Sequence, residues 1–227
     1  MDLSPIFISL KTASLAIVIT FFLGVGTAWG VVCLRRPKVK IVIDGILTLP
    51  MVLPPTVAGF FLLYVFGVQR PVGSFLVRFF GLKVPFSWGA TVLAAVVISF
   101  PLMYRAARGA FEQVNPQYIQ AARTLGMPSY KIFWRVVLPL ALPGVASGGI
   151  LAFARALGEF GATAMIAGNI AGKTRTLPLA IYSAVAAGDM GSAMEYVLVL
   201  VGIAFIMLAG LNWLTAKKGY NGAGGGR

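Results

Sequence analysis

Five stretches of the chain carry no charged residue, and short polar or basic segments separate them. Each stretch is long enough to cross about 30 Å of hydrocarbon as a helix. None alternates apolar and polar residues with the period of two that typifies a membrane barrel strand. The pattern predicts an all-α, polytopic membrane protein with about five transmembrane helices, covering residues 12–34, 45–69, 84–104, 136–154 and 196–216.

Composition supports a membrane protein. Hydrophobic residues make up 59% of the chain, charged residues only 11%, and the mean hydropathy is +0.89. So few charges could not cover the surface of a soluble domain. The first stretch is too long for a signal-peptide core and runs directly into Arg35-Arg36, so we interpret it as a retained helix. We expect one transmembrane domain over residues 1–216 and a flexible tail over 217–227.

The net charge of +13 would suggest nucleic-acid binding in a soluble protein. Here lysine and arginine gather between the apolar stretches, which is typical of cytoplasmic loops. Placing these segments in the cytoplasm puts the N-terminus outside and the C-terminus inside a cell (inner or plasma) membrane. We therefore expect contact with membrane lipid and none with nucleic acid. The basic segments are residues 35–40, 105–135 and 217–218.

The chain contains few of the side chains that usually carry out catalysis. The chain has no histidine and a single cysteine, and its six acidic residues are scattered along the sequence, which argues against a metal site or a carboxylate pair. Residues 168–174 resemble a phosphate-binding loop but have three residues between the glycines where that loop needs four. We expect no enzyme activity and no cofactor in this chain, so any ATP must be used by another subunit.

A polar segment, about residues 108–139, lies between two apolar stretches. Asn115-Pro116 is a good helix start, and Gly126 fits a helix end. Pro128 then begins a second short helix that continues to about residue 135. The sequence predicts two short helices that meet at a sharp turn and face a soluble partner; the alternative is a hairpin on the membrane surface. A mildly apolar face at helical spacing comprises Tyr118, Ala121, Ala122 and Leu125.

Two other features point to a solute path. Pro50, Pro54 and Pro55 interrupt the second stretch and remove backbone donors, so this helix either lines a cavity or is satisfied by its neighbours. Arg155 and Glu159 are spaced to pair along a helix and form either a polar element of the path or an interfacial ion pair.

Two pairs of glycines predict close helix packing inside the subunit. They are Gly26 with Gly30, and Gly144 with Gly148. Residues 162–192 are too short in their apolar part to span upright and are expected to be re-entrant or to lie at the outer interface.

The polar segment resembles the cytoplasmic motif of ABC importer permeases. That motif reads Glu-Ala-Ala, three residues, Gly, nine residues and Ile-x-Leu-Pro; here Gln120 replaces the Glu and Val136 replaces the Ile, with the spacing kept. The resemblance implies the type I importer permease fold and a coupling-helix loop that contacts an ATPase. The residues implied in coupling are Tyr118, Gln120, Ala121, Ala122, Leu125, Gly126, Leu138 and Pro139.

Residues 49–59 and 153–163 resemble the molybdate permease family, with sulfate/thiosulfate and tungstate permeases as close relatives. The likeness covers about residues 5–215. It implies a homodimer that imports a tetrahedral oxyanion, an ABC ATPase homodimer holding ATP and magnesium, and an extracytoplasmic substrate-binding protein. We favour molybdate as the solute. The expected pathway residues are Pro50, Pro54, Pro55, Thr56, Arg155, Glu159 and Thr163.

Other functions stay open at this point. A stand-alone secondary transporter or channel would also be polytopic, although the sequence offers no obvious proton relay. Basic residues expected in the outer loops would attract a dianion or dock an acidic binding protein. They are Arg70, Arg78, Lys83, Lys173 and Arg175.

Overall fold

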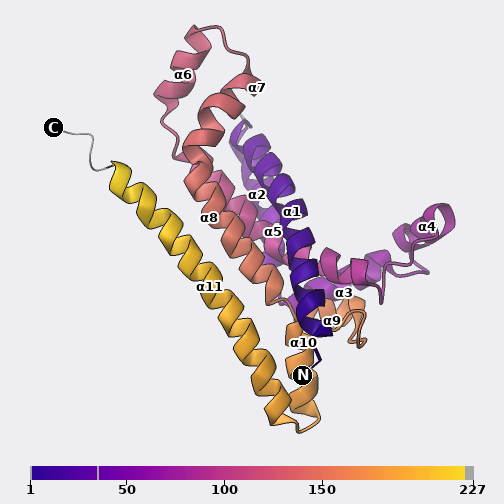
Figure 1. The fold of residues 1–227 in the computed structure, drawn as a ribbon. Coiled ribbons are helices and arrows are strands. Elements are labelled where there is room, and N and C mark those ends of the chain that lie inside the picture. Colours follow the sequence, from indigo (N-terminus) through magenta and orange to yellow (C-terminus); the bar gives the residue numbers. More distant parts are fainter. Residues whose placement is uncertain (1, 35, 223–227) are drawn as a thin grey trace.

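The computed structural model describes residues 2–34 and 36–222, with side chains described as far as residue 210. Within these residues every regular element is helical, which confirms the predicted fold class. Four helices are long and apolar enough to cross a membrane: α1 (Ser4–Val32), α5 (Trp88–Glu112), the continuous helix Ser129–Leu157 and α11 (Met190–Gly222). Figure 1 shows α1, α5 and α8 (Leu138–Leu157) side by side, with α11 running beside α8 along a similar direction.

The second predicted span is sharply bent. α2 (Pro37–Val52) and α3 (Pro55–Phe66) meet at 110° and together form the fifth candidate span. Leu53 and Pro54 have extended backbone conformations, and Pro54 cannot donate a backbone hydrogen bond. α2 therefore ends before Leu53, and α3 begins after Pro54. The prolines correctly predicted a break, but the expectation of one transmembrane helix covering residues 45–69 is replaced by two helices in different directions.

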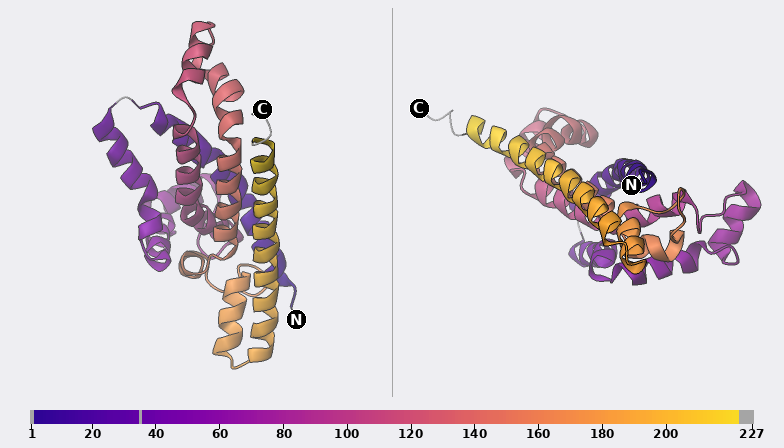
Figure 2. Two further views of the ribbon diagram at one scale, coloured as in Figure 1. Left: turned by 90° about the vertical axis from the view of Figure 1, so that its left-hand side faces the viewer. Right: turned by 60° about the horizontal axis from the view of Figure 1, so that its bottom comes forward.

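Three shorter helices lie where the sequence suggested loops or left the structure open. α4 (Pro71–Phe80) occupies the predicted loop 67–87 and projects sideways from the bundle (Figure 2). α9 (Gly161–Ala167) follows α8, and α10 (Leu177–Ala186) forms a hairpin with α11. α11 continues to Gly222, so the first part of the tail expected at 217–227 is helical, and residues 223–227 lie outside the described residues.

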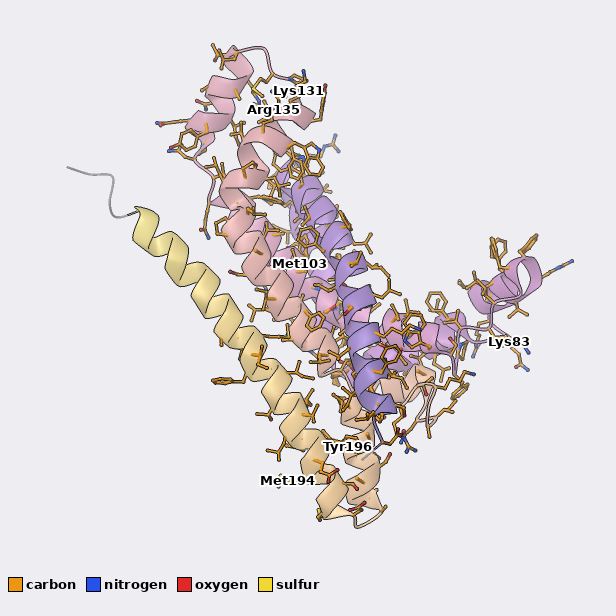
Figure 3. All side chains as sticks on the ribbon, in the orientation of Figure 1. Lys83, Met103, Lys131, Arg135, Met194 and Tyr196 are labelled. Atoms are coloured by element: carbon orange, nitrogen blue, oxygen red, sulfur yellow. The ribbon has the colours of Figure 1, made fainter. Side chains whose placement is uncertain are left out.

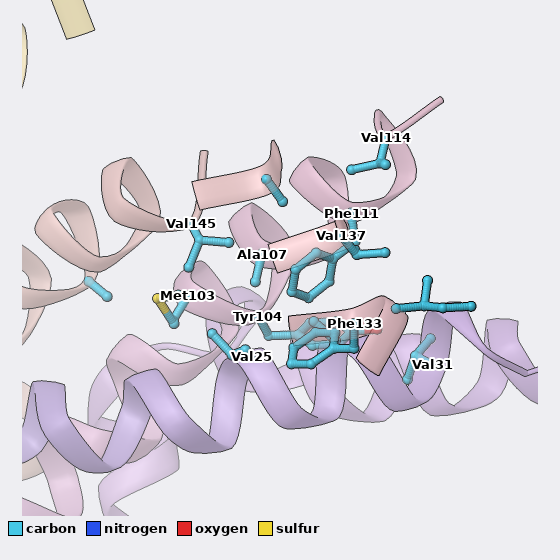
Figure 4. Packing of buried hydrophobic residues seen from close by; sticks show 14 of the residues in the cluster. Val25, Val31, Met103, Tyr104, Ala107, Phe111, Val114, Phe133, Val137 and Val145 are labelled. Carbon is cyan, nitrogen blue, oxygen red and sulfur yellow. The ribbon is translucent and has the colours of Figure 1, made fainter. Parts of the chain in front are cut away.

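The core gathers along α5. Met103 and Tyr104 are fully buried between α1 and α8, and Phe111 and Phe133 meet edge to face at 5.8 Å between ring centroids (Figure 4). Two buried hydroxyl pairs join α1 to α5: Thr12 to Thr91 at 3.1 Å and Thr20 to Ser99 at 3.2 Å. Polar bonds between apolar helices satisfy groups that lipid cannot.

Small residues let α8 approach α5. A Cβ built on Gly148 would lie 2.3 Å from the Cβ of Ala106, and one on Gly144 would lie 2.7 Å from that of Ala110. This confirms close packing at the second glycine pair. The first pair behaves differently, because Gly26 and Gly30 have no neighbouring atom within 4 Å of an added Cβ. The expectation that this pair packs inside the subunit is wrong.

The chain between α5 and α8 makes one sharp turn. α6 (Pro116–Thr124) leads into the turn and α7 (Ser129–Ile132) leads out. A π-helical segment, Phe133–Val137, then joins α7 to α8 without a break. α7 is therefore the beginning of the fourth membrane-spanning helix rather than a separate short helix. The predicted boundary between them near residue 135 is wrong, because the helix continues through it.

Candidate functional site

Local chemistry forms the turn between α6 and α7, which we call the elbow (residues 116–132). The Asn115 side chain accepts a hydrogen bond from the backbone N–H of Gln117 at 2.9 Å and caps α6. Gly126 has φ +73°, a left-handed conformation that suits glycine. The Met127 N–H reaches back to the Ala122 carbonyl at 3.1 Å. The predicted helix start and helix end are both confirmed.

The elbow presents an apolar surface at one end of the bundle (Figures 1 and 2). Leu125 is 80% exposed and Tyr118 is 57% exposed. Exposed large apolar side chains on a polar segment mark a docking surface better than scattered single ones do. Gln120 and Ala121 are exposed beside them.

Ala122 does not belong to that surface. It is 5% exposed and packs in the cluster that contains Ile132 and Phe133. The four residues expected to form one apolar face therefore do not share a surface, because Tyr118, Ala121 and Leu125 are exposed while Ala122 is buried. Leu138 is half-buried and Pro139 exposed at the start of α8, beyond the π-helical segment. The small side chain at 122 lets α6 approach α7 rather than a partner.

Basic side chains surround the elbow. Figure 3 shows Lys131 and Arg135 at this end of the bundle, while Lys83 lies on the sideways arm that carries α4. Two of the basic residues predicted for the outer loops are held locally: the Arg70 guanidinium lies 4.0 Å from the Tyr64 ring centroid, and Arg175 Nε donates to Asn169 Oδ1 at 2.8 Å.

The bend between α2 and α3 borders a cavity of about 270 Å³, which we call the bend cavity. Three predicted pathway residues, Pro50, Pro55 and Arg155, line it together. Sequence reasoning missed the remaining lining residues because they are ordinary apolar positions whose contact depends on how the helices pack. They are Met51, Leu53, Ile98 and Leu102.

Arg155 and Glu159 form the predicted ion pair, with Arg155 Nη1 2.8 Å from Glu159 Oε2. The Glu159 side chain is 2% exposed, whereas that of Arg155 is 37% exposed. Glu159 Oε1 also accepts the backbone N–H of Ala162 at 2.8 Å and so caps α9. The carboxylate is thus fixed by two partners, while the guanidinium keeps an open side toward the bend cavity.

The other predicted pathway residues lie around this pair. Thr163 is buried in α9, and Pro54 and Thr56 are exposed at the start of α3. A Cβ on Gly161 would lie 3.2 Å from the Thr56 backbone nitrogen, so α9 approaches α3 closely here. The structure brings these residues near one another but places only three of the seven in the lining of the bend cavity.

A second charged group, the ion cluster of Lys40, Asp44, Arg108 and Glu112, was not predicted. Arg108 bonds both Asp44 and Glu112, with Nε 3.0 Å from Glu112 Oε1, and Lys40 Nζ lies 2.8 Å from the same oxygen. The Tyr104 hydroxyl donates to Asp44 at 2.9 Å. Acids that are scattered in the sequence therefore meet in space. The i, i+4 spacing on each helix was a signal, but the pairing of α2 with α5 was not.

Among the described residues no group of three or more metal-ligating side chains occurs. In the segment 168–174, the Thr174 hydroxyl is buried and accepts the Ile170 N–H at 3.0 Å. The hydroxyl that a phosphate-binding loop would direct to a metal is used within the turn.

The known proteins that resemble the chain agree on its family. A family model described as "Binding-protein-dependent transport system inner membrane component" matches residues 20–218. The molybdenum transport system permease protein ModB of Escherichia coli K12 is 43% identical over 210 residues, covering 92% of this chain and 91% of the relative. A putative molybdenum transport permease, YvgM of Bacillus subtilis 168, is 40% identical over 208 residues, covering 90% of each.

Solved structures with the same fold are also ABC transporters. The MetNI methionine transporter in inward-facing conformations aligns with a TM-score of 0.73 at 16% identity, covering 94% of each chain. A bacterial alginate importer aligns with a TM-score of 0.73 at 15% identity, covering 95% of this chain and 79% of the other. The fold is that of type I ABC importer permeases, and the chain belongs to the family of binding-protein-dependent transport system inner membrane components.

Proposed function

We propose that this chain is the permease subunit of an ATP-driven importer for a tetrahedral oxyanion, with molybdate as the solute. The observation that carries the proposal is the elbow, a rigidly capped turn that exposes Tyr118 and Leu125 at one end of a membrane bundle. Relatives named as molybdenum transport permeases support the choice of solute.

The proposed assembly has two copies of the chain around one path. The elbow of each copy contacts one subunit of an ABC ATPase homodimer, which holds ATP and magnesium. A binding protein delivers the oxyanion from outside, as the neighbour crystallised with an alginate-bound periplasmic protein illustrates for another solute. The elbow and the basic residues near it then face the cytoplasm, and the N-terminus faces outward.

The energetics favour this division of labour. A fully dehydrated dianion in a low-dielectric interior would be prohibitively costly, so the path must be hydrated and its contacts weak. The open side of Arg155 supplies such a contact, because Glu159 already offsets part of its charge. High affinity then resides in the binding protein, and the permease needs only to pass the ion.

Crosslinking tests the elbow. In a Cys33→Ser background, Leu125→Cys should crosslink to the ATPase subunit. Met190→Cys, which is 64% exposed at the start of α11, at the opposite end of the bundle, is the matched control and should not. A chain that never captures the ATPase at residue 125, or captures it equally at 190, would contradict the proposed coupling role.

Uptake by proteoliposomes tests the solute. With ATPase and binding protein present, ATP should drive molybdate uptake in preference to sulfate, and the chain alone should neither hydrolyse ATP nor pass oxyanion. Oxyanion flux through liposomes that contain only this chain would instead identify a channel or secondary transporter. Preference for sulfate would retain the importer and change the solute.

A further inference from the structure

One face of α5 connects three cavities. Ile98, Leu102, Arg105 and Gly109 follow the i, i+4, i+7, i+11 spacing of a single helix face. The first two line the bend cavity with Arg155. The last two line a cavity of about 200 Å³ beside the ion cluster and also a larger one of about 620 Å³ between α5 and α8. Seven residues of helix separate Ile98 from Arg105, a rise of roughly 10 Å.

Neighbouring helices cover this face at Ile98, which is buried against α3 and α9, and leave the rest of it partly open. On one side Tyr104 and Arg108 bond Asp44 of α2. On the other side Ala106 packs against Gly148 of α8. Arg105, between them, is exposed, and the larger cavity extends from it to Tyr118 on the elbow. From Leu102 to Gly109 the face is therefore a partly open wall that runs from the bend cavity toward the elbow.

Charge along this wall is uneven. The ion cluster contains two cations and two anions that bond one another, so it contributes little net charge. Arg155 shares its charge with Glu159. Among the residues that the structure describes, Arg105 makes no ion pair with an acidic side chain. Asp44 lies near enough to attract the Arg105 charge, but no carboxylate bonds Arg105 directly, unlike Arg108 and Arg155.

We propose that Arg105 is a second anion contact, which receives the oxyanion after Arg155 and releases it toward the cytoplasm. The inference rests on the proposed function and deepens it. A guanidinium presents several N–H donors in a plane that match two oxygens of a tetrahedral oxyanion. Its exposure to water keeps the contact weak, and weak successive sites let an ion both enter and leave a path.

Uptake by the complete transporter tests the contact. Arg105→Ala should lower the rate of oxyanion uptake by about tenfold, the loss expected for one charge-assisted contact. Arg105→Lys should retain only part of the rate, because lysine keeps the charge and loses the planar donors. The matched control is Arg36→Ala, which removes the same charge from an exposed residue immediately before α2 that lines none of the three cavities. Equal losses at 36 and 105 would show a general effect of basic charge and overturn the proposal.

Chemical restoration of the charge separates an anion contact from a structural role. Cys33 is the only cysteine, so Arg105→Cys can be made in a Cys33→Ser background. Modification with an aminoethyl thiosulfonate should restore uptake, and modification with a sulfonatoethyl thiosulfonate should not. A structural role would respond to neither reagent or equally to both, which would overturn the proposal.

Uptake by the unmodified transporter distinguishes a failure of the proposed function from a failure of the role of Arg105. If the unmodified transporter imports an oxyanion and Arg105→Ala imports it at the same rate, only the role of Arg105 fails. If the unmodified transporter imports no oxyanion, the proposed function fails and the role of Arg105 fails with it.

Discussion

Gly126 has the strictest backbone requirement in the elbow. Its φ of +73° disfavours side chains, and no atom lies within 4 Å of an added Cβ, so the cost of substitution is conformational rather than steric. Left-handed backbone costs L-residues about 1 to 2 kcal/mol, and asparagine tolerates it better than β-branched residues. The turn that aims Leu125 therefore depends on the residue at 126.

Gly126→Val should lower the uptake obtained per ATP hydrolysed, and Gly126→Asn should lower it less, because valine shifts the turn away from the ATPase. The ratio of transport to hydrolysis in proteoliposomes measures this coupling. Gly81 has φ +66°, also without close neighbours, and lies on the α4 arm, so Gly81→Val is the matched control with unchanged coupling. Full coupling in Gly126→Val would contradict the role of the turn.

Single residues were predictable where the cause was local. Asn115 and Gly126 act on their own helix ends, so their roles could be inferred from adjacent residues. The orientation of Ala122 could not, since burying it depends on α7 packing against α6. For the same reason the pairing of Arg155 with Glu159, four residues apart, was predicted correctly, although Glu159 lies just beyond the end of α8, while that of Asp44 with Arg108, on different helices, was not.

At the scale of elements, contact between α5 and α8 depends on the absence of side chains. Gly148→Ala should destabilise the subunit by about 1 to 3 kcal/mol, the usual cost of overpacking, because the new Cβ would meet that of Ala106 at 2.3 Å. Thermal unfolding in detergent measures the loss. Adding Ala106→Gly should recover part of it.

Gly30→Ala provides the control for that series. Its added Cβ meets nothing within 4 Å, so the melting temperature of the subunit should stay unchanged or rise slightly. A loss at residue 30 as large as at residue 148 would show that glycine itself, and not the contact with Ala106, sets the stability.

The elements also show how far sequence patterns reach. Proline in the second span predicted that a helix would end near residue 54, but the 110° angle between α2 and α3 depends on contacts with α9. α2 has no buried residue, so the ion cluster supplies much of what fixes it against α5. Such contacts have no periodic signature along the chain.

At the scale of the whole molecule, the charge composition separates the two classes of transporter. Proton-coupled transporters use chains of Asp, Glu or His in the membrane. This chain has no histidine, and three of its acids, Asp44, Glu112 and Glu159, are bonded to arginine. The chain therefore offers few side chains that could carry protons and couple transport to a proton gradient.

Uptake into ATP-loaded proteoliposomes should therefore change by less than about twofold when a protonophore is added. The membrane potential must be clamped with potassium and valinomycin, because movement of a dianion is itself sensitive to voltage. Removing ATP should abolish uptake. Collapse of uptake by the protonophore with ATP still present would favour proton coupling.

The π-helical segment Phe133–Val137 has a geometric consequence for the direction in which the protein meets its partner. Wider turns of this kind accommodate one more residue than an α-helix does, and one residue corresponds to about 100° around a helix axis. A shortened chain that ran straight from α7 into α8 would rotate the elbow by that angle. The one additional residue in the π-helical segment therefore determines the direction in which the elbow points around the axis of α8.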